Sequence, residues 1–224
     1  MNAGLSNLAF IKSQLLAAAL RASTDYDAQI QALGLGIASQ MERYCNRKFM
    51  RTVGAVDVFP ADRVQFLLTF SPVEIVTGAA VKQDETDGFI NQLNNPEPFI
   101  RIIDYNNGMV DCGSTDVGKE WQQVQFTYTG GYFWEQQEPT INGVANPAYP
   151  TAVPATAFLL PNDLLLAWIL QCKYVWQIFD PLNTKIAAGQ ESGPRAIAQQ
   201  VMGDLDLLPA VQKMIAQYVR YGLV

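Results

Sequence analysis

The spacing of apolar residues changes twice along this chain of 224 residues, and this change limits the fold more than any other feature. Near both ends apolar side chains recur every three or four positions, the period of an amphipathic helix, and in the middle every second position, the period of a half-buried strand. The sequence therefore predicts an α+β fold. We expect one domain over 1–224, a helical bundle of N-terminal helices and long C-terminal helices with an inserted antiparallel β-sheet or small sandwich.

The helical part is expected to cover residues 5–48 and 161–224. A first helix is predicted to end near Arg21 with Ser6 as its cap, and a second begins after Ser23-Thr24-Asp25, whose side chains suit an N-cap. Thr24 and Asp27 have nearly the spacing of a capping box. One face of the second helix is predicted to carry Ile30, Leu33, Ile37, Met41 and Tyr44.

Residues 50–133 are predicted to form the β-rich insertion. Between 121 and 129, Val124, Phe126 and Tyr128 alternate with polar residues, which indicates a strand with one side against a core. Asn106-Asn107-Gly108 lies between two apolar runs and is typical of a hairpin. Gly130-Gly131 indicates a turn with positive φ. Short strands with tight turns predict a meandering antiparallel sheet, with a small sandwich or barrel as its form.

The remaining segments differ in composition. Residues 135–160 form a proline-rich loop. The five prolines between Glu138 and Pro161, with no charge after Glu138, predict irregular structure over the surface or over a neighbour. A third helix is predicted from Pro161-Asn162-Asp163 to Asp180-Pro181, and a last one from about Leu208-Pro209. Between these helices, residues 183–203 are rich in glycine and small or amide side chains, which indicates a flexible arm.

Composition excludes most catalytic sites. The chain has no histidine, which removes the usual general base, Ser-His and Cys-His pairs, and His-ligated metals. Fifteen basic and 21 acidic residues give a net charge of -6, which argues against a dedicated nucleic-acid binder because such proteins carry a basic excess. We expect no enzymatic activity, no cofactor and no metal. The apolar stretch from Leu164 to Phe179 is shorter than the ~20 residues of a membrane span, so a soluble intracellular protein is expected.

Few groups of side chains in the sequence resemble a catalytic, metal-binding or DNA-binding site. Acid clusters that could act as carboxylate dyads or metal ligands are expected to be helix caps and solvated turns. The basic cluster is expected to end a helix, with an arginine paired to a local acid, although contact with a DNA backbone or with an acidic partner is the alternative. The cysteines match no metal spacing and are expected to be small buried residues. The acid clusters are Asp25/Asp27, Asp84/Glu85/Asp87 and Asp204/Asp206. The basic cluster is Arg43, Arg47, Lys48 and Arg51, and the cysteines are Cys45, Cys112 and Cys172.

Five motifs, taken in order, resemble those of the head-tail connector, or adaptor, proteins of tailed bacteriophages. Singly each is weak, but together they cover nearly the whole chain. The departures are the longer proline-rich segment and a longer N-terminal helix. The motifs are Ala38-Ser39-Gln40-Met41-Glu42-Arg43-Tyr44-Cys45-Asn46-Arg47-Lys48-Phe49, Phe70-Ser71-Pro72-Val73, the hairpin Tyr105 to Val110, Phe126-Thr127-Tyr128-Thr129-Gly130-Gly131-Tyr132, and Leu160-Pro161-Asn162-Asp163-Leu164.

This resemblance implies a structural protein of the virion neck, made in the cytoplasm of a host bacterium. It implies a homo-oligomeric ring of about a dozen copies with heterologous contacts, which binds the phage portal protein and a tail terminator, stopper or tail tube protein. Double-stranded DNA would pass through the ring passively. The low fraction of charged residues, 16%, suggests a surface that neighbouring subunits cover.

The contacts with portal or tail are expected at the arm and at the C-terminus, because both are predicted to be mobile or terminal. The alternatives are another neck or tail ring protein, such as a tail terminator or stopper, and a carboxylate-based hydrolase acting through Asp84 or Asp204. A stopper should be smaller and mostly sheet. The predicted interface residues are Lys185, Gln190, Arg195, Tyr218, Arg220, Tyr221, Leu223 and Val224.

Overall fold

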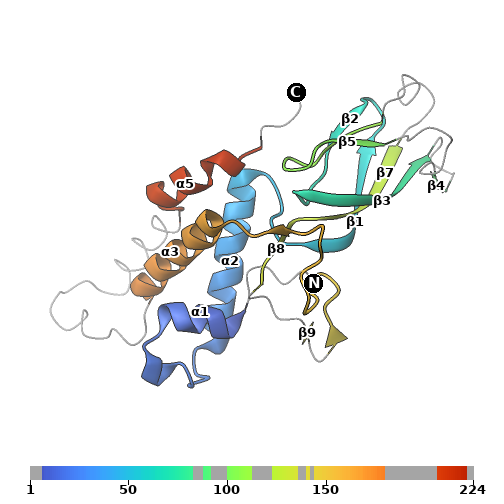
Figure 1. The fold of residues 1–224 in the computed structure, drawn as a ribbon. Helices are drawn as coiled ribbons and strands as arrows, with labels where there is room; N and C mark the ends of the chain where they lie inside the picture. Colours follow the sequence, from blue (N-terminus) through green and yellow to red (C-terminus); the bar gives the residue numbers. More distant parts are fainter. Residues whose placement is uncertain are drawn as a thin grey trace. The chain divides into compact units, whose positions relative to one another are not determined.

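The computed structural model describes residues 7–82, 88–91, 100–112, 123–135, 140–141, 144–179 and 206–220 (Figure 1). The chain divides into two compact units. A helical unit takes its described residues from Ala3–Cys45 and Pro161–Val219, and a sheet unit takes them from Asn46–Leu160 and from Arg220–Val224. The structure confirms the α+β class, with helices in one unit and antiparallel strands in the other.

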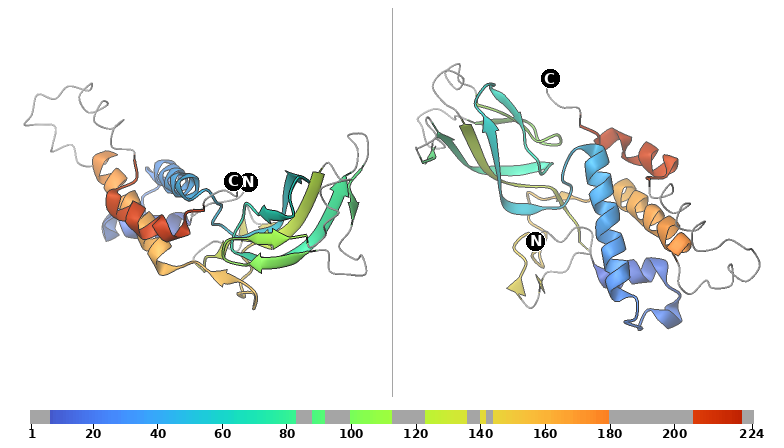
Figure 2. Two further views of the ribbon diagram at one scale, coloured as in Figure 1. Left: turned by 90° about the horizontal axis from the view of Figure 1, so that it is seen from above. Right: turned by 180° about the vertical axis from the view of Figure 1, so that it is seen from behind.

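Within the helical unit, α2 packs against α1 and α3, and α3 packs against α1 and α5 (Figure 2). The buried centre is formed by Ile30, Met41, Trp168 and Ile215, each at most 2% exposed. The predicted third helix is confirmed from Asn162 onward. The elements of this unit are α1 (Leu8–Leu15), the 3-10 turn η1 (Ala18–Leu20), α2 (Asp27–Cys45), α3 (Asn162–Phe179), α5 (Pro209–Ile215) and the 3-10 turn η2 (Ala216–Tyr218).

The first helix is shorter than predicted. It ends at Leu15, and the following Leu16 is extended, so the prediction that it continues to Arg21 was wrong. Arg21 explains the early end, because its side chain donates hydrogen bonds to the carbonyls of Leu16 and Ser13, which a helix terminus leaves without partners. At the other end the cap is Asn7, whose side-chain oxygen accepts from the Phe10 N–H at 2.9 Å.

The buried face of α2 is rotated from the predicted one. Ile30, Ile37 and Met41 are buried as expected, but the face ends on Cys45, and Tyr44 is 40% exposed. The predicted place of Tyr44 on the buried face was therefore wrong. At the helix start, the Asp27 carboxylate accepts from Lys12 Nζ at 2.5 Å. Asp27 thus begins α2 and joins it to α1.

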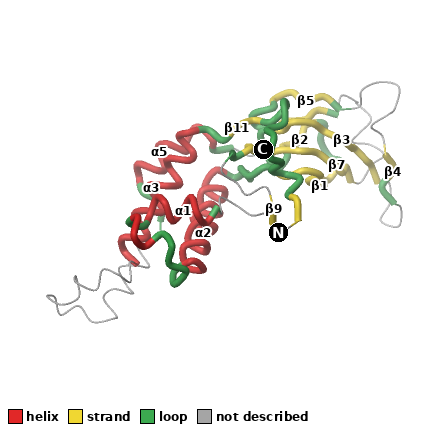
Figure 3. Tube along the Cα trace, turned by 60° about the horizontal axis from the view of Figure 1, so that its bottom comes forward, coloured by secondary structure: helices red, strands yellow, loops and turns green. Residues whose placement is uncertain are grey.

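The strands of the sheet unit form two larger sheets, visible as yellow tubes in Figure 3. One has the order β1-β7-β3-β4 and the other β2-β6-β5. Because β7 lies between β1 and β3, the prediction of a simple meander was wrong. The strands are β1 (Thr52–Pro60), β2 (Gln65–Leu67), β3 (Val73–Lys82), β4 (Ile90–Asn91), β5 (Arg101–Asp104), β6 (Met109–Asp111), β7 (Gln123–Gly130), β8 (Tyr132–Phe133), β9 (Thr140–Ile141), β10 (Val144–Ala145) and β11 (Phe158–Leu159).

The two larger sheets share one core, as the predicted small sandwich requires. Phe126 and Tyr128 of β7 are fully buried in a cluster with Phe66 of β2 and Val110 of β6. The predicted hairpin is confirmed, because β5 and β6 pair antiparallel and Gly108 between them has a φ of 70°. The Gly131 turn is confirmed as well, with a φ of 97°, and a Cβ there would lie 2.4 Å from the Met50 carbonyl oxygen.

The proline-rich segment is more ordered than predicted. β9 pairs with β10, and β11 pairs in parallel with β8, so the expectation of wholly irregular structure was wrong. The Leu160 N–H also donates to the carbonyl of Phe133 at 2.8 Å. Proline blocks long strands, but strands of two residues fit between the prolines.

Candidate functional site

Two of the predicted interface residues lie within the described part of the chain, and both bind other residues of the chain. The Tyr218 hydroxyl lies 2.7 Å and 2.9 Å from the two carboxylate oxygens of Asp163, at the start of α3. Arg220 is described below. Lys185, Gln190, Arg195, Tyr221, Leu223 and Val224 lie outside the described residues.

Arg220 binds the sheet unit through hydrogen bonds to backbone carbonyls. Its guanidinium donates to the carbonyls of Leu68 at 2.6 Å, Asn107 at 2.9 Å, Asn46 at 3.1 Å and Thr69 at 3.3 Å. Burial, followed by the positive charge of Arg47, lowers the pKa of Arg220 to about 10. The described part of the chain therefore ends on hydrogen bonds from Arg220 to the sheet unit.

The basic cluster is used for internal packing. Arg47 is buried, donates to the Asn106 carbonyl at 2.9 Å, and lies over the rings of Phe49 and Tyr132. Arg51 is buried and paired with Glu74, which confirms the expected pairing with a local acid. Arg43 lies in the last turn of α2, as expected for a cation near the negative end of a helix. Buried Arg47 and Arg51 are thus not available to DNA phosphates in this fold.

The candidate catalytic groups are not brought together in the described structure. Asp25 accepts from the Ser23 hydroxyl just before α2, and Asp27 pairs with Lys12. Asp84, Glu85, Asp87 and Asp204 lie outside the described residues. Within the described ranges, no group of three or more His, Cys, Asp or Glu residues is placed to hold a metal ion.

The structure confirms the prediction that the three cysteines are buried. Cys45, Cys112 and Cys172 are each buried as free thiols. Burial, assisted by Asp111, raises the pKa of Cys112 to about 12, and burial raises that of Cys172 to about 12. Such thiols stay protonated near neutral pH and react slowly. Among the described residues, no helix is long and apolar enough to cross a membrane.

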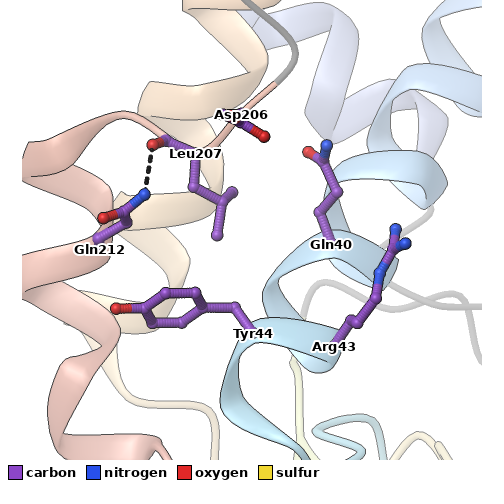
Figure 4. Close-up of a pocket in the computed structure, with 6 residues that line it drawn as sticks. All are labelled: Gln40, Arg43, Tyr44, Asp206, Leu207 and Gln212. Atoms are coloured by element: carbon purple, nitrogen blue, oxygen red, sulfur yellow. Dashed lines mark hydrogen bonds between the residues drawn. The ribbon is translucent and has the colours of Figure 1, made fainter.

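A polar hollow of about 320 Å³ opens between α2 and the start of α5 (Figure 4). The Tyr44 ring points toward Leu207 and Gln212, and Gln212 donates to the Leu207 carbonyl at 2.9 Å. Its lining has no nucleophile beside a base, and Arg43 and Asp206 supply its charges. The lining also supplies amide and hydroxyl groups that can form hydrogen bonds. The lining residues are Gln40, Arg43, Tyr44, Asp206, Leu207 and Gln212.

Two apolar surfaces were not singled out by the sequence. On β1, Val53, Val56 and Val58 are each 45% exposed or more, and on α3 Leu166 and Leu170 are 49% and 38% exposed. Periodicity placed Val53 and Val58 in strands without assigning them to an exposed surface. On the third helix it expects the apolar band to run through Leu164, Leu165 and Trp168, and it leaves Leu166 and Leu170 outside that band.

Comparison with known proteins finds solved structures with a similar fold. No protein-family model and no curated protein matches the chain. A chain of the solved structure described as "Neck of empty GTA particle computed with C6 symmetry" is 12% identical, with a TM-score of 0.56, over 99% of this chain and 92% of that chain. A chain of "Virion of native gene transfer agent (GTA) particle" is 10% identical, with a TM-score of 0.51, over 97% of this chain and 90% of that chain.

Proposed function

We propose that the chain is a structural subunit of the neck of a phage-like particle, where it joins the capsid portal to the tail. The observation that carries this proposal is the likeness to a neck chain of a gene transfer agent particle, which extends over 99% of this chain. A fold match of this length includes both units and the order of their segments. The order of connector-like motifs in the sequence supports the same role independently.

The subunit would act as one of about a dozen copies in a closed ring, in which each copy contacts its neighbours through two different surfaces. The C6 symmetry of the neck containing the similar chain supports a ring. The helical unit favours an adaptor over a stopper, since a stopper should be smaller and mostly sheet. Catalysis is not required in this role, in keeping with a chain that has no histidine.

The ring would extend the DNA channel of the portal and let the genome pass without holding it. A net charge of -6 per copy repels phosphates, so we expect weak binding to double-stranded DNA. Filter binding tests this. We expect little DNA to be retained at any salt concentration, and tight retention at physiological salt would contradict passive passage.

The role itself is tested by deleting the gene from the genome that encodes the particle. We expect electron micrographs of the lysate to show heads and tails that are not joined, and the wild-type gene supplied in trans to restore complete particles. Complete, infectious particles formed without the protein would overturn the proposal. A deletion that removes the heads themselves would contradict a role limited to the neck.

A further inference from the structure

The guanidinium of Arg220 lies among four backbone carbonyls, each of which accepts one hydrogen bond from it. Nη1 donates to the carbonyls of Leu68 at 2.6 Å and Asn107 at 2.9 Å. Nη2 donates to those of Asn46 at 3.1 Å and Thr69 at 3.3 Å. The two terminal nitrogens of a guanidinium carry four N–H groups, so donors and acceptors are equal in number. We call these four carbonyls the carbonyl cradle; all of them belong to the sheet unit.

The carbonyl cradle is held in place by bonds that do not involve Arg220. Three of its four residues donate their own N–H groups elsewhere in the sheet unit. These bonds run from Leu68 to the Gly108 carbonyl at 2.9 Å, from Thr69 to Asp57 Oδ2 at 2.7 Å, and from Asn107 to Asp104 Oδ1 at 3.0 Å. Leu68 is also fully buried. Acceptors fixed in this way are preorganised for their occupant.

The carbonyl cradle suits a guanidinium group better than an ammonium group. Burial and the positive charge of Arg47 lower the pKa of Arg220, whereas Tyr128 and Asp57 act in the opposite direction, and the resulting pKa of about 10 leaves the group charged at neutral pH. A lysine ammonium has only three donors and starts from a lower ordinary pKa. It would leave at least one of the four carbonyls without a donor.

The bonds to the carbonyl cradle come from the head of the arginine and not from its stem. In the described structure Arg220 Nε is buried and has no hydrogen-bond partner. The contacts made by the two terminal nitrogens are therefore available to any guanidinium group, whatever carries it. A buried donor without a partner is also unfavourable, so Arg220 is an imperfect occupant of the cradle.

We propose that the carbonyl cradle is a guanidinium-binding site, which takes an arginine side chain of another molecule when Arg220 is not in it. Its four acceptors match the four terminal N–H groups of a guanidinium, and three of them are fixed without Arg220. The site exists whether or not the chain forms a ring, because every contact that builds it lies within one copy.

Chemical rescue tests the site. The full-length variant Arg220→Ala is heated with guanidinium chloride or acetylarginine amide at millimolar concentrations, far below those that denature proteins. We expect its melting temperature to rise with concentration and level off, by about 2–4 °C at about five times the dissociation constant. Methylammonium chloride and sodium chloride at the same ionic strength should have no such effect, and wild-type protein should not be stabilised.

Arg21→Ala is the matched control, because Arg21 also donates to two backbone carbonyls but is exposed. An equal rise in this variant would show a general solvent effect and overturn the proposal, as would no rise in Arg220→Ala. An equal rise with methylammonium would contradict a guanidinium site. A response to guanidinium but not to acetylarginine amide would show that the cradle does not admit an arginine from outside. If Arg220→Ala does not fold, Arg220→Lys takes its place and the same outcomes decide.

Discussion

Arg51 and Glu74 form a two-point ion pair that is buried on both sides. Arg51 Nε lies 2.6 Å from Oε1 of Glu74, and Nη2 lies 2.9 Å from Oε2. The same guanidinium donates to the Ala148 carbonyl at 2.6 Å, and the Arg51 N–H donates to the Tyr149 hydroxyl at 2.8 Å. The pair therefore connects the start of β1, the start of β3 and the proline-rich segment.

Replacing Arg51 by methionine should destabilise the sheet unit strongly. Glu74 would be left buried without its charged partner, which typically costs about 3–5 kcal/mol. The double variant Arg51→Met/Glu74→Leu should lose much less, because no uncompensated charge remains. Urea unfolding followed by circular dichroism measures both. Arg63→Met, which breaks the exposed pair with Asp62, is the control and should change the midpoint little. If the double variant loses as much unfolding free energy as the two single variants together, Arg51 and Glu74 are not coupled.

Gln171 should hold the start of α5. Its amide is fully buried, accepts from the Leu208 N–H at 2.9 Å and donates to the Asp206 carbonyl at 3.1 Å, whereas Leu208 itself gives α5 no side-chain cap. Gln171→Leu should cost about 1–3 kcal/mol by leaving a backbone donor without a partner. Hydrogen exchange should then rise in Pro209–Ile215 more than in α2. Gln177→Leu, on an exposed position of the same helix, should leave exchange unchanged.

The native protein should not react with thiol reagents. All three cysteines are buried, and at pH 8 the thiols of Cys112 and Cys172, with pKa values near 12, remain protonated. A colorimetric thiol assay should therefore detect no thiol in the folded protein and three per chain in guanidinium chloride. Rapid reaction of one thiol in the folded protein would show that its part of the core opens.

Asp104 should make the hairpin between β5 and β6 sensitive to acid. Burial opposes ionisation, but hydrogen bonds from the Asn107 N–H and side chain hold the pKa of Asp104 below its ordinary value of 3.8. A carboxyl group whose pKa is lower in the folded state than in the unfolded state stabilises the fold at pH values above its pKa in the unfolded state. This contribution is lost as the pH falls through the pKa of the group in the folded state. Asp104→Asn should lower the free energy of unfolding at pH 7 by only roughly 0.5 kcal/mol, since solvent screens this carboxylate, and the melting temperature should fall with it. At pH 2.5 the difference should shrink, and an equal difference at both pH values would contradict this account.

Local patterns predicted most elements of the fold. The strict alternation at Val124, Phe126 and Tyr128 and the turn at Gly108 depend on near neighbours, and both are confirmed. The early end of α1 depends on the Arg21 side chain, and the pairing of β11 with β8 joins segments 26 residues apart, Phe158 with Tyr132. Propensity does not encode such distant partners, so the sequence alone could not predict them.

The candidate site was harder to predict than the fold. Tyr218 and Arg220 were chosen because they are close to the chain end, but the structure commits both to hydrogen bonds within the chain. On the third helix, by contrast, the helical period places Leu164 in the band expected to be buried and leaves Leu166 and Leu170 out of it, and the exposures confirm this.

The central claim is that this chain forms a ring in the neck of a phage-like particle. Electron microscopy of the full-length protein mixed with the portal protein from the same genome tests it most directly. We predict one additional ring on the tail-facing side of the portal, with density for a helical and a sheet unit in each copy. Portals that remain bare at saturating protein, or single copies bound without a ring, would contradict the claim.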